Sequence, residues 1–273
     1  MMKSVRKRRG ARLGQHFLTG TWAAKRLAES AQAHAEEIIL EIGPGKGALT
    51  RELLETGARV IAIEKDAALV EELHITFAPE IASNQLILLE DDIRNFEPRS
   101  LKLEARGYVL AANIPYYITG EIIRMFLTTE IQPRRMVLLI QKEVADRILA
   151  RDKKESILSL SVKAYGVPRV VAKVSRGNFS PPPSVDSAIL AIENISRDFF
   201  NEIDESSFFK IVRAGFSSKR KFLARNLAVS FPLSAVRDAF KQCAIDEKAR
   251  AEDLPLVTWK RLTKHLSTFR ESV

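Results

Sequence analysis

The sequence predicts an α/β protein with a parallel, doubly wound sheet, followed by a small helical domain. From residue 22 to about residue 150, apolar runs of strand length alternate with helical stretches, which is typical of parallel strands joined by right-handed crossovers. After residue 155 this alternation stops, and the sequence beyond residue 205 is typical of helices. We therefore expect one domain over residues 1–195 and a second over residues 205–273, with a polar linker between them.

The elements of the first domain follow from its apolar runs. The predicted strands are "EIILEIGPG", "ARVIAIEKD", "QLILLEDD", "YVLAANIPYY" and "RRMVLLIQ". The predicted helices are residues 22–33, "ALTRELLETG", "AALVEELHITF", "EIIRMFLTTE" and "KEVADRILA". Gly57 closes the second of these helices, where a residue with positive φ costs little. A further helix, "SILSLSVKAY", precedes two paired strands, "RVVAKVS" and "AILAIEN", which are separated by a stiff loop with three consecutive prolines.

Length and composition are those of a soluble globular protein. With 273 residues and 46% hydrophobic content, the chain can bury a sizeable core. No apolar run approaches the roughly 20 residues of a membrane span, and no secretory apolar segment follows the basic N-terminus. The single cysteine, Cys243, excludes an internal disulfide and fits a reducing compartment. We therefore expect a cytoplasmic protein with no membrane partner.

The positive charge is concentrated at the two ends of the chain. The formal net charge is +9, and residues 1–28 hold eight basic residues and no acidic one. Residues 29–192 hold 20 basic and 23 acidic residues, whereas residues 193–273 hold 15 basic and 11 acidic ones. This distribution favours a polyanionic partner such as nucleic acid. The alternative for the N-terminal arm is a solvated, disordered tail.

The segment "EIGPGKG" predicts a ligand-binding turn between a strand and a helix. Glycines there let the backbone turn tightly and approach a ligand, and Glu64 follows Gly43 by 21 residues, a spacing suited to ribose hydroxyls. NAD is the competing ligand, but the spacing is G-x-G-x-G and Lys46 is the only basic residue near a pyrophosphate. Asp91, after the third strand, could accept a hydrogen bond from an adenine amino group. The alternative for Asp91 and for its neighbour Asp92 is a surface turn or helix N-cap residue. The combination favours S-adenosylmethionine.

The segment "NIPYY" follows the fourth strand and is expected in the same crevice. The Asn113 side-chain oxygen and the Ile114 carbonyl could each accept one N–H of an exocyclic amine and aim its lone pair at a methyl donor. Tyr116 could stack on one face of the base and Phe179 on the other. The alternative is a strand-terminating turn with Tyr117 packed in the core, and the neighbouring ligand elements disfavour the turn as the role of the segment. In either case we expect Tyr117 to be ordinary packing.

These motifs together resemble one known family. The segments "LGQHFL", "EIGPGKGALT", "VIAIEKD", "NIPYYIT", "LIQKEVADRI", "FSPPPSVDSAI" and "VRAGFSSKRKFLARNL" occur in the order seen in the KsgA-type ribosomal RNA adenine dimethyltransferases. The resemblance runs from about Arg12 to beyond residue 260. It implies a Rossmann-like methyltransferase sheet, mostly parallel with one antiparallel strand, and a small helical C-terminal domain.

The resemblance also implies an activity and its residues. The activity is dimethylation of N6 in two adjacent adenosines near the 3′ end of 16S ribosomal RNA in the small subunit, with S-adenosylmethionine as the methyl donor. We expect a monomeric enzyme that contains no metal. The implied cofactor contacts are His16, Leu18, Gly43, Glu64, Asp91 and Asn113. The implied catalytic residues are Asn113, Ile114, Tyr116 and Phe179. Two positions depart from the family pattern, His16 where many relatives have asparagine and Asp92 where alanine is frequent.

The segment "SSKRKFLARN" is expected to be a helix in the C-terminal domain. It would present Lys219, Arg220, Lys221 and Arg225. A solvated helix face is the alternative, and the resemblance and the charge distribution favour contact with the RNA backbone.

Two other functions compete with this hypothesis. One is that of the related class of enzymes that methylate large-subunit RNA. The proline-rich motif and the basic C-terminal segment argue against this class. The other is a ribosome-assembly factor that binds immature small subunits and methylates only incidentally.

Overall fold

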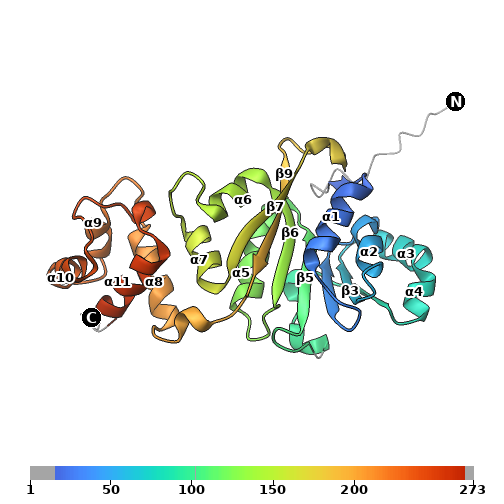
Figure 1. The fold of residues 1–273 in the computed structure, drawn as a ribbon, viewed down its shortest axis with the longest axis horizontal. Helices are drawn as coiled ribbons and strands as arrows, with labels where there is room; N and C mark the ends of the chain where they lie inside the picture. Colours follow the sequence, from blue (N-terminus) through green and yellow to red (C-terminus); the bar gives the residue numbers. More distant parts are fainter. Residues whose placement is uncertain (1–15, 102, 268–273) are drawn as a thin grey trace. The chain divides into compact units, whose positions relative to one another are not determined.

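The computed structural model describes residues 16–101 and 103–267 and divides them into two units (Figure 1). The first unit contains residues up to 145 together with 169–193, and the second contains 146–168 together with the residues from 194 onward. The basic N-terminal arm, residues 1–12, lies outside the described residues. The domain ranges expected from the sequence, 1–195 and 205–273, stay a prediction.

A seven-stranded sheet forms the centre of the first unit. Its strands lie in the order β4-β3-β2-β5-β6-β9-β7. Their bounds are Ile38–Ile42 (β2), Arg59–Glu64 (β3), Leu86–Glu90 (β4), Tyr108–Asn113 (β5), Arg135–Gln141 (β6), Val167–Val174 (β7) and Ser187–Glu193 (β9). The pairs from β4 through β6 are parallel, whereas β9 runs antiparallel to β6. The predicted fold class, a mostly parallel sheet with one antiparallel strand, is confirmed.

The central strands of this sheet are largely apolar and buried, as expected where helices cover a sheet. β5 and β6 are buried at every position except the last residue of each, as expected for parallel strands that have no solvated face. The helices of this part of the chain are Thr21–Ala31 (α1), Ala48–Leu54 (α2), Ala67–Thr76 (α3), Ala78–Ala82 (α4), Thr119–Thr128 (α5) and Lys142–Leu149 (α6). Asp66 begins α3 as an N-cap, because its side chain accepts a hydrogen bond from Ala68 N.

A two-stranded ribbon joins the N-terminal segment to the proline-rich loop. β1, Phe17–Leu18, pairs antiparallel with β8, Phe179–Ser180, so that Leu18 lies opposite Phe179. Thr19 N also donates to Asn178 O at 2.9 Å. The ribbon therefore fixes the chain ahead of α1. None of the seven strands of the main sheet pairs with β1.

The second unit is helical. Its helices are Ile157–Tyr165 (α7), Glu205–Gly215 (α8), Leu223–Leu227 (α9), Leu233–Cys243 (α10) and Leu256–Leu266 (α11). They enclose a separate apolar core with Phe208 and Trp259 at its centre, both fully buried. Rings of Tyr165, Phe199, Phe200 and Phe208 contact one another at centroid distances of 5.1–5.8 Å.

The prediction of a helix over "SSKRKFLARN" is wrong for the first half of this segment. α8 ends at Gly215, where a Cβ would overlap the Trp259 ring. The chain then turns, and the buried Asn226 amide donates to Gly215 O at 2.6 Å and to Ser218 O at 2.9 Å. Two adjacent serines favour such a turn, because their side chains compete with the helix for backbone groups. Residues 219–221 therefore lie on an exposed turn, and only Arg225 lies on α9.

Among the described residues, no helix combines the length and the apolar content needed to cross a bilayer.

Candidate active site

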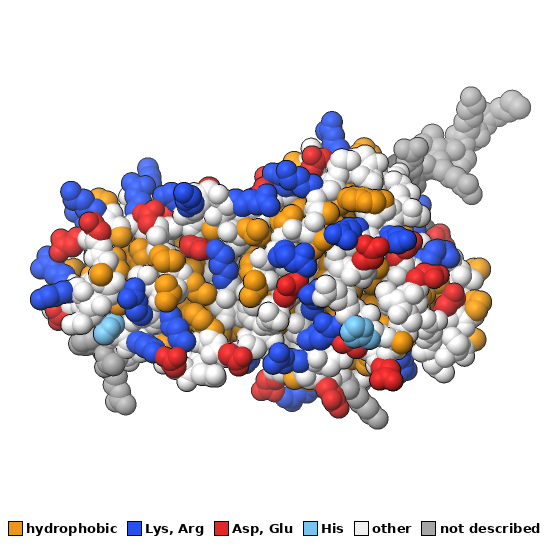
Figure 2. Space-filling model, viewed as in Figure 1, with side chains coloured by type: hydrophobic (Ala, Val, Ile, Leu, Met, Phe, Trp, Pro, Cys, Tyr) orange, Lys and Arg blue, Asp and Glu red, His pale blue; other side chains and the backbone are white. Residues whose placement is uncertain are grey.

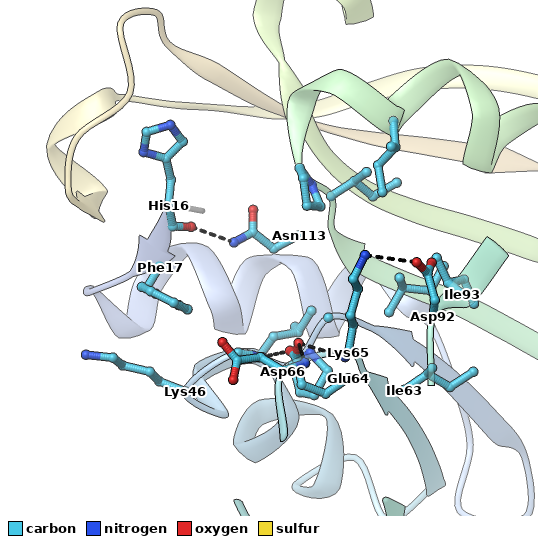
Figure 3. Close-up of a pocket in the computed structure, with 18 of the residues that line it drawn as sticks. His16, Phe17, Lys46, Ile63, Glu64, Lys65, Asp66, Asp92, Ile93 and Asn113 are labelled. Atoms are coloured by element: carbon cyan, nitrogen blue, oxygen red, sulfur yellow. Dashed lines mark hydrogen bonds and ion pairs between the residues drawn. The ribbon is translucent and has the colours of Figure 1, made fainter. Parts of the chain in front are cut away.

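A pocket lies at the carboxyl ends of the four strands β2, β3, β4 and β5 (Figure 3). The glycine turn follows β2, and polar side chains lie at or just after the ends of β3, β4 and β5. His16 and the two residues of β1, Phe17 and Leu18, also border the pocket. Crossover connections leave a crevice at this edge of a parallel sheet. The pocket thus lies where the sequence predicted a ligand site.

The glycine turn after β2 has a conformation that requires glycine. Gly43, Gly45 and Gly47 have φ values of 65°, 60° and 76°, in the left-handed region that other residues rarely occupy. At Gly47 a Cβ would also overlap the Phe77 ring, and at Gly45 it would lie 3.0 Å from the Phe17 ring. The turn is therefore packed between two aromatic side chains, with its backbone facing the pocket.

Glu64, at the end of β3, is held by the glycine turn and by its own backbone. Its Oε2 accepts a hydrogen bond from Gly45 N at 3.1 Å, and its Oε1 accepts from Lys65 N at 2.9 Å and Asp66 N at 3.0 Å. The side chain is only 4% exposed. Three backbone donors thus fix the orientation of the carboxylate at the pocket wall.

Asp91 and Asp92 follow β4 and behave differently. Asp91 Oδ1 accepts from Asp92 N at 2.7 Å. Asp92 caps the short 3₁₀ helix Ile93–Asn95 by accepting from Arg94 N, and it pairs with Lys65 Nζ at 3.0 Å and with the Arg94 guanidinium (Figure 3). Hydrogen bonds from Arg94 and Lys65 hold the pKa of Asp92 well below its usual range. Asp92 is thus the capping residue that the sequence left open, and its ion pairs link the ends of β3 and β4.

Asn113, at the end of β5, is oriented by the N-terminal segment. Its Nδ2 donates to the backbone carbonyl of His16 at 3.1 Å (Figure 3). The His16 ring in turn donates from Nδ1 to Pro181 O at 2.8 Å. Because the amide nitrogen has a partner in the protein, Oδ1 is the atom left to accept a hydrogen bond from a ligand.

The two tyrosines after Asn113 point in different directions. Tyr116 is half-buried, and its hydroxyl is 2.7 Å from Ser187 Oγ. Burial raises the pKa of Tyr116. Tyr117 is 70% exposed at the pocket, so its expected packing in the core is wrong. The segment Tyr116–Ile118 is a 3₁₀ turn, in which successive side chains project about 120° apart. The two rings therefore differ in burial although both border the pocket.

A comparison of the sequence with known protein families agrees with this fold and with the arrangement of residues at the strand ends. A model described as "Ribosomal RNA adenine dimethylase" matches residues 6–268. The chain belongs to the ribosomal RNA adenine dimethylase family. Membership confirms the predicted enzyme class, an adenine dimethyltransferase of ribosomal RNA, and implies an S-adenosylmethionine cofactor.

Individual relatives of this dimethylase cover most of its length. It is 38% identical over 252 residues to the ribosomal RNA small subunit methyltransferase A of Dehalococcoides mccartyi strain CBDB1, which covers 92% of this chain and 86% of the relative. It is 32% identical over 254 residues to the protein of the same name from Clostridium botulinum strain ATCC 19397, covering 92% and 91%.

Solved structures show the same fold. A dimethyladenosine transferase from Plasmodium falciparum superposes with a TM-score of 0.78 and 27% identity, over 90% of this chain and 96% of that one. The 23S rRNA methyltransferase ErmE superposes with a TM-score of 0.75 and 24% identity, over 92% and 99%. The second likeness concerns the fold alone.

Most of the predicted site residues of this dimethylase meet in the one pocket. Its lining includes His16, Leu18, Gly43, Glu64, Asp91, Asn113, Ile114 and Tyr116. Phe179 is not part of the lining. Its ring is 4% exposed and packs in the core of the first unit, opposite Leu18 in the β1–β8 ribbon. The predicted contact of Phe179 with a base therefore has no counterpart in this pocket.

Several residues that line the pocket, or that contact its lining, were not singled out from the sequence. Phe17 lies over the glycine turn, and the buried side chains of Ile63 and Ile93 form apolar walls beside Asp91. Ser187 contacts Tyr116 from β9. The sequence signal for Ser187 was its place in the specific motif "FSPPPSVDS", whereas nothing in the pattern distinguishes Ile63 or Ile93 from other core residues.

The predicted RNA-binding residues are exposed. Lys219, Arg220 and Lys221 lie on the turn after α8, and Arg225 lies on α9. Figure 2 shows Lys and Arg side chains over much of the visible surface, with Asp and Glu among them. The positions are accessible to a polyanion, and their role stays a prediction.

Proposed function

We propose that this protein dimethylates N6 of two adjacent adenosines near the 3′ end of 16S ribosomal RNA in the small ribosomal subunit, acting as a monomer with S-adenosylmethionine as donor. The observation that carries the proposal is the orientation of Asn113. Its amide nitrogen is bound to His16 O, so its oxygen is left for a donor in a pocket that also contains the glycine turn and Glu64.

The pocket residues fit this cofactor. The positive-φ turn from Gly43 to Gly47 brings backbone against the ligand without Cβ atoms, and the Glu64 carboxylate is fixed where ribose hydroxyls can donate to it. The apolar side chains of Ile63 and Ile93 can enclose an adenine ring. Asp91 is placed to accept from the amino group of that ring.

The substrate amine needs orientation more than acid–base help, because its lone pair is delocalised into the adenine ring. When bound, S-adenosylmethionine supplies an electrophilic methyl group on a good leaving group. Asn113 Oδ1 and the Ile114 carbonyl accept the two N–H groups of the amine. The backbone at Ile114 is held by a bond from its N–H to Leu139 O at 3.3 Å, and Pro115 follows. Such orientation can contribute about 7–11 kcal/mol.

The aromatic residues provide the contacts to the base. Tyr116 is anchored beside Asn113 and can stack on the target adenine. Tyr117 joins the predicted Phe179 as a further aromatic candidate for the base, because its exposed ring borders the pocket. Aromatic stacking on a base is worth roughly 1–3 kcal/mol. Residues 219–221 and Arg225 are proposed to contact the phosphate backbone.

The small-subunit target is supported by the relatives. The curated proteins from D. mccartyi and C. botulinum carry the name of small subunit methyltransferases. The competing large-subunit activity is supported only by a likeness of fold, since the ErmE sequence is 24% identical to this chain.

The test is product mapping. Purified protein is incubated with labelled S-adenosylmethionine and unmethylated small subunits, and the modified nucleosides are located by mass spectrometry. We expect N6,N6-dimethyladenosine at two adjacent positions near the RNA 3′ end. Any other product would overturn the proposal.

An Asn113→Ala variant provides the matched control. We expect it to abolish methylation while subunit binding stays within a few-fold of the wild-type value. Methylation at the wild-type rate would contradict the role of Asn113. Retained subunit binding would also leave room for a role in subunit assembly.

A further inference from the structure

The motif "FSPPPSVDS" is the most specific pattern in the sequence, yet its aromatic residue does not line the pocket. Phe179 is buried in the core. Ser187, the last residue of this motif, contacts the side chain of a pocket residue, because its Oγ lies 2.7 Å from the Tyr116 hydroxyl. The bond joins residues 71 positions apart in the chain.

Ser187 is held rigidly. It is 0% exposed and is the first residue of β9, in register with Gln141 of β6. The preceding residue is also fixed, because Asp186 accepts bonds from Lys142 N and from Arg176 N, both at 3.0 Å. A serine hydroxyl in such a site has one rotatable bond, so it offers the phenol a defined partner.

Tyr116 has no such rigidity of its own. It lies in a short 3₁₀ turn, it is half-buried, and two torsions set its ring. Its other ring neighbour is His16, at a centroid distance of 5.7 Å and an interplanar angle of 31°. The bond to Ser187 therefore fixes the far end of the ring, while the backbone fixes the near end.

We propose that Ser187 is a positioning residue for methyl transfer: its buried hydroxyl holds the Tyr116 ring in the orientation that stacks on the target adenine. The inference rests on the proposed function, because it assigns Tyr116 to the base. Ser187 does not line the pocket and does not touch the substrate. Its effect is transmitted through the phenol alone.

A double-mutant cycle tests the inference. The variants are Ser187→Ala, Tyr116→Phe and the double variant, and the measurement is the single-turnover methylation rate on unmethylated small subunits. A net hydrogen bond of ordinary strength corresponds to a loss of roughly threefold to tenfold. We expect each single variant to lose this much and the double variant to lose no more than either.

Three further measurements separate positioning from folding. S-adenosylmethionine affinity and subunit affinity should stay within about twofold of wild type, so that the loss is in the rate. Ser159→Ala is the matched control, because Ser159 is also a fully buried serine but belongs to the N-terminal capping box of α7. It should lower the thermal midpoint while the methylation rate stays at the wild-type value.

Other results would overturn the inference. Ser187→Ala at the wild-type rate would do so, as would a double variant whose loss equals the product of the two single losses. If Ser187→Ala does not fold, Tyr116→Phe decides alone, and a wild-type rate in that variant would exclude the positioning role. A wild-type protein that makes no dimethyladenosine would overturn the proposed function and this inference with it, whereas additive losses with normal product would overturn only the inference.

Discussion

Glu41 provides a prediction that depends on the fold alone. It is the fourth residue of β2, it is 0% exposed, and it lies in register between Ala62 of β3 and Ala111 of β5. Burial raises the pKa of Glu41 to about 8, and the nearby charge of Glu64 adds to this, while the Thr50 hydroxyl opposes it. In the unfolded chain the same group has its ordinary pKa of 4.5.

The sign of the pH dependence follows from these two values. Between pH 4.5 and about 8 the folded protein keeps the Glu41 proton and the unfolded chain releases it. The free energy of unfolding should therefore fall as the pH rises through this window, by at most about 1.4 kcal/mol per pH unit. Glu41→Gln removes the titrating group. The variant should lose this part of the slope and should be more stable than the wild type at pH 8.

The assay is urea unfolding of both proteins at several values between pH 5.5 and 8.5. Glu37→Gln is the matched control, because hydrogen bonds from Arg134 lower the pKa of Glu37. Its contribution to stability is lost only as the pH falls through the acidic range, so this variant should keep the wild-type slope above pH 5.5. An unchanged slope in Glu41→Gln would refute the reasoning.

Three other predictions concern the glycine turn, the pocket mouth and the basic turn. Gly47→Ala should destabilise the protein by roughly 1–3 kcal/mol in urea unfolding, because it combines positive φ with overlap on Phe77, whereas Gly120→Ala has open space and should not. Tyr117→Ala should raise the KM for unmethylated subunits several-fold without changing cofactor affinity. Trp22→Ala removes another exposed ring, one outside the pocket lining, and should leave KM unchanged. Alanines at residues 219–221 should weaken subunit binding and lower the slope of log K against log salt by up to about 2.

Controls make these outcomes decisive. A triple alanine variant at Arg237, Lys241 and Lys248 removes the same charge from exposed positions of the same unit. If it lowers the salt slope as much as the variant at 219–221, the effect is one of net charge and the basic turn is not a specific contact. Equal effects of Tyr117→Ala and Trp22→Ala on KM would likewise exclude a role for the pocket mouth.

The polar residues at the strand ends were predictable because two simple rules place them. Parallel strands end at the same edge of a sheet, and a glycine turn must follow the first of them. Gly43, Glu64, Asp91 and Asn113 therefore meet in one pocket. The bond between Asn113 and the His16 carbonyl was not predictable, because a backbone acceptor carries no sequence signal.

The incorrect predictions share a cause, which is that local pattern does not report side-chain direction. Tyr117 looked like packing material beside an apolar strand, but a 3₁₀ turn separates its ring from that of Tyr116. The basic segment looked helical, yet tertiary bonds from Asn226 stabilise a turn there. Phe179 is buried in the core of the first unit, and its predicted contact with a base stays a prediction. The tertiary contact of Ser187 could not be predicted from spacing.

The carbonyl of His16 has a practical consequence for anyone who alters the N-terminus of this protein. The main sheet makes its ladder without β1, so a chain shortened past Leu18 can retain the strands at whose ends Gly43, Glu64 and Asp91 lie. It would nevertheless lose the acceptor that keeps the Asn113 amide from rotating by half a turn and presenting its NH₂ to the substrate. Cofactor affinity would report the loss of His16, Phe17 and Leu18 from the pocket lining but not the orientation of the Asn113 amide. Truncations or N-terminal fusions should therefore be judged by the rate of methyl transfer.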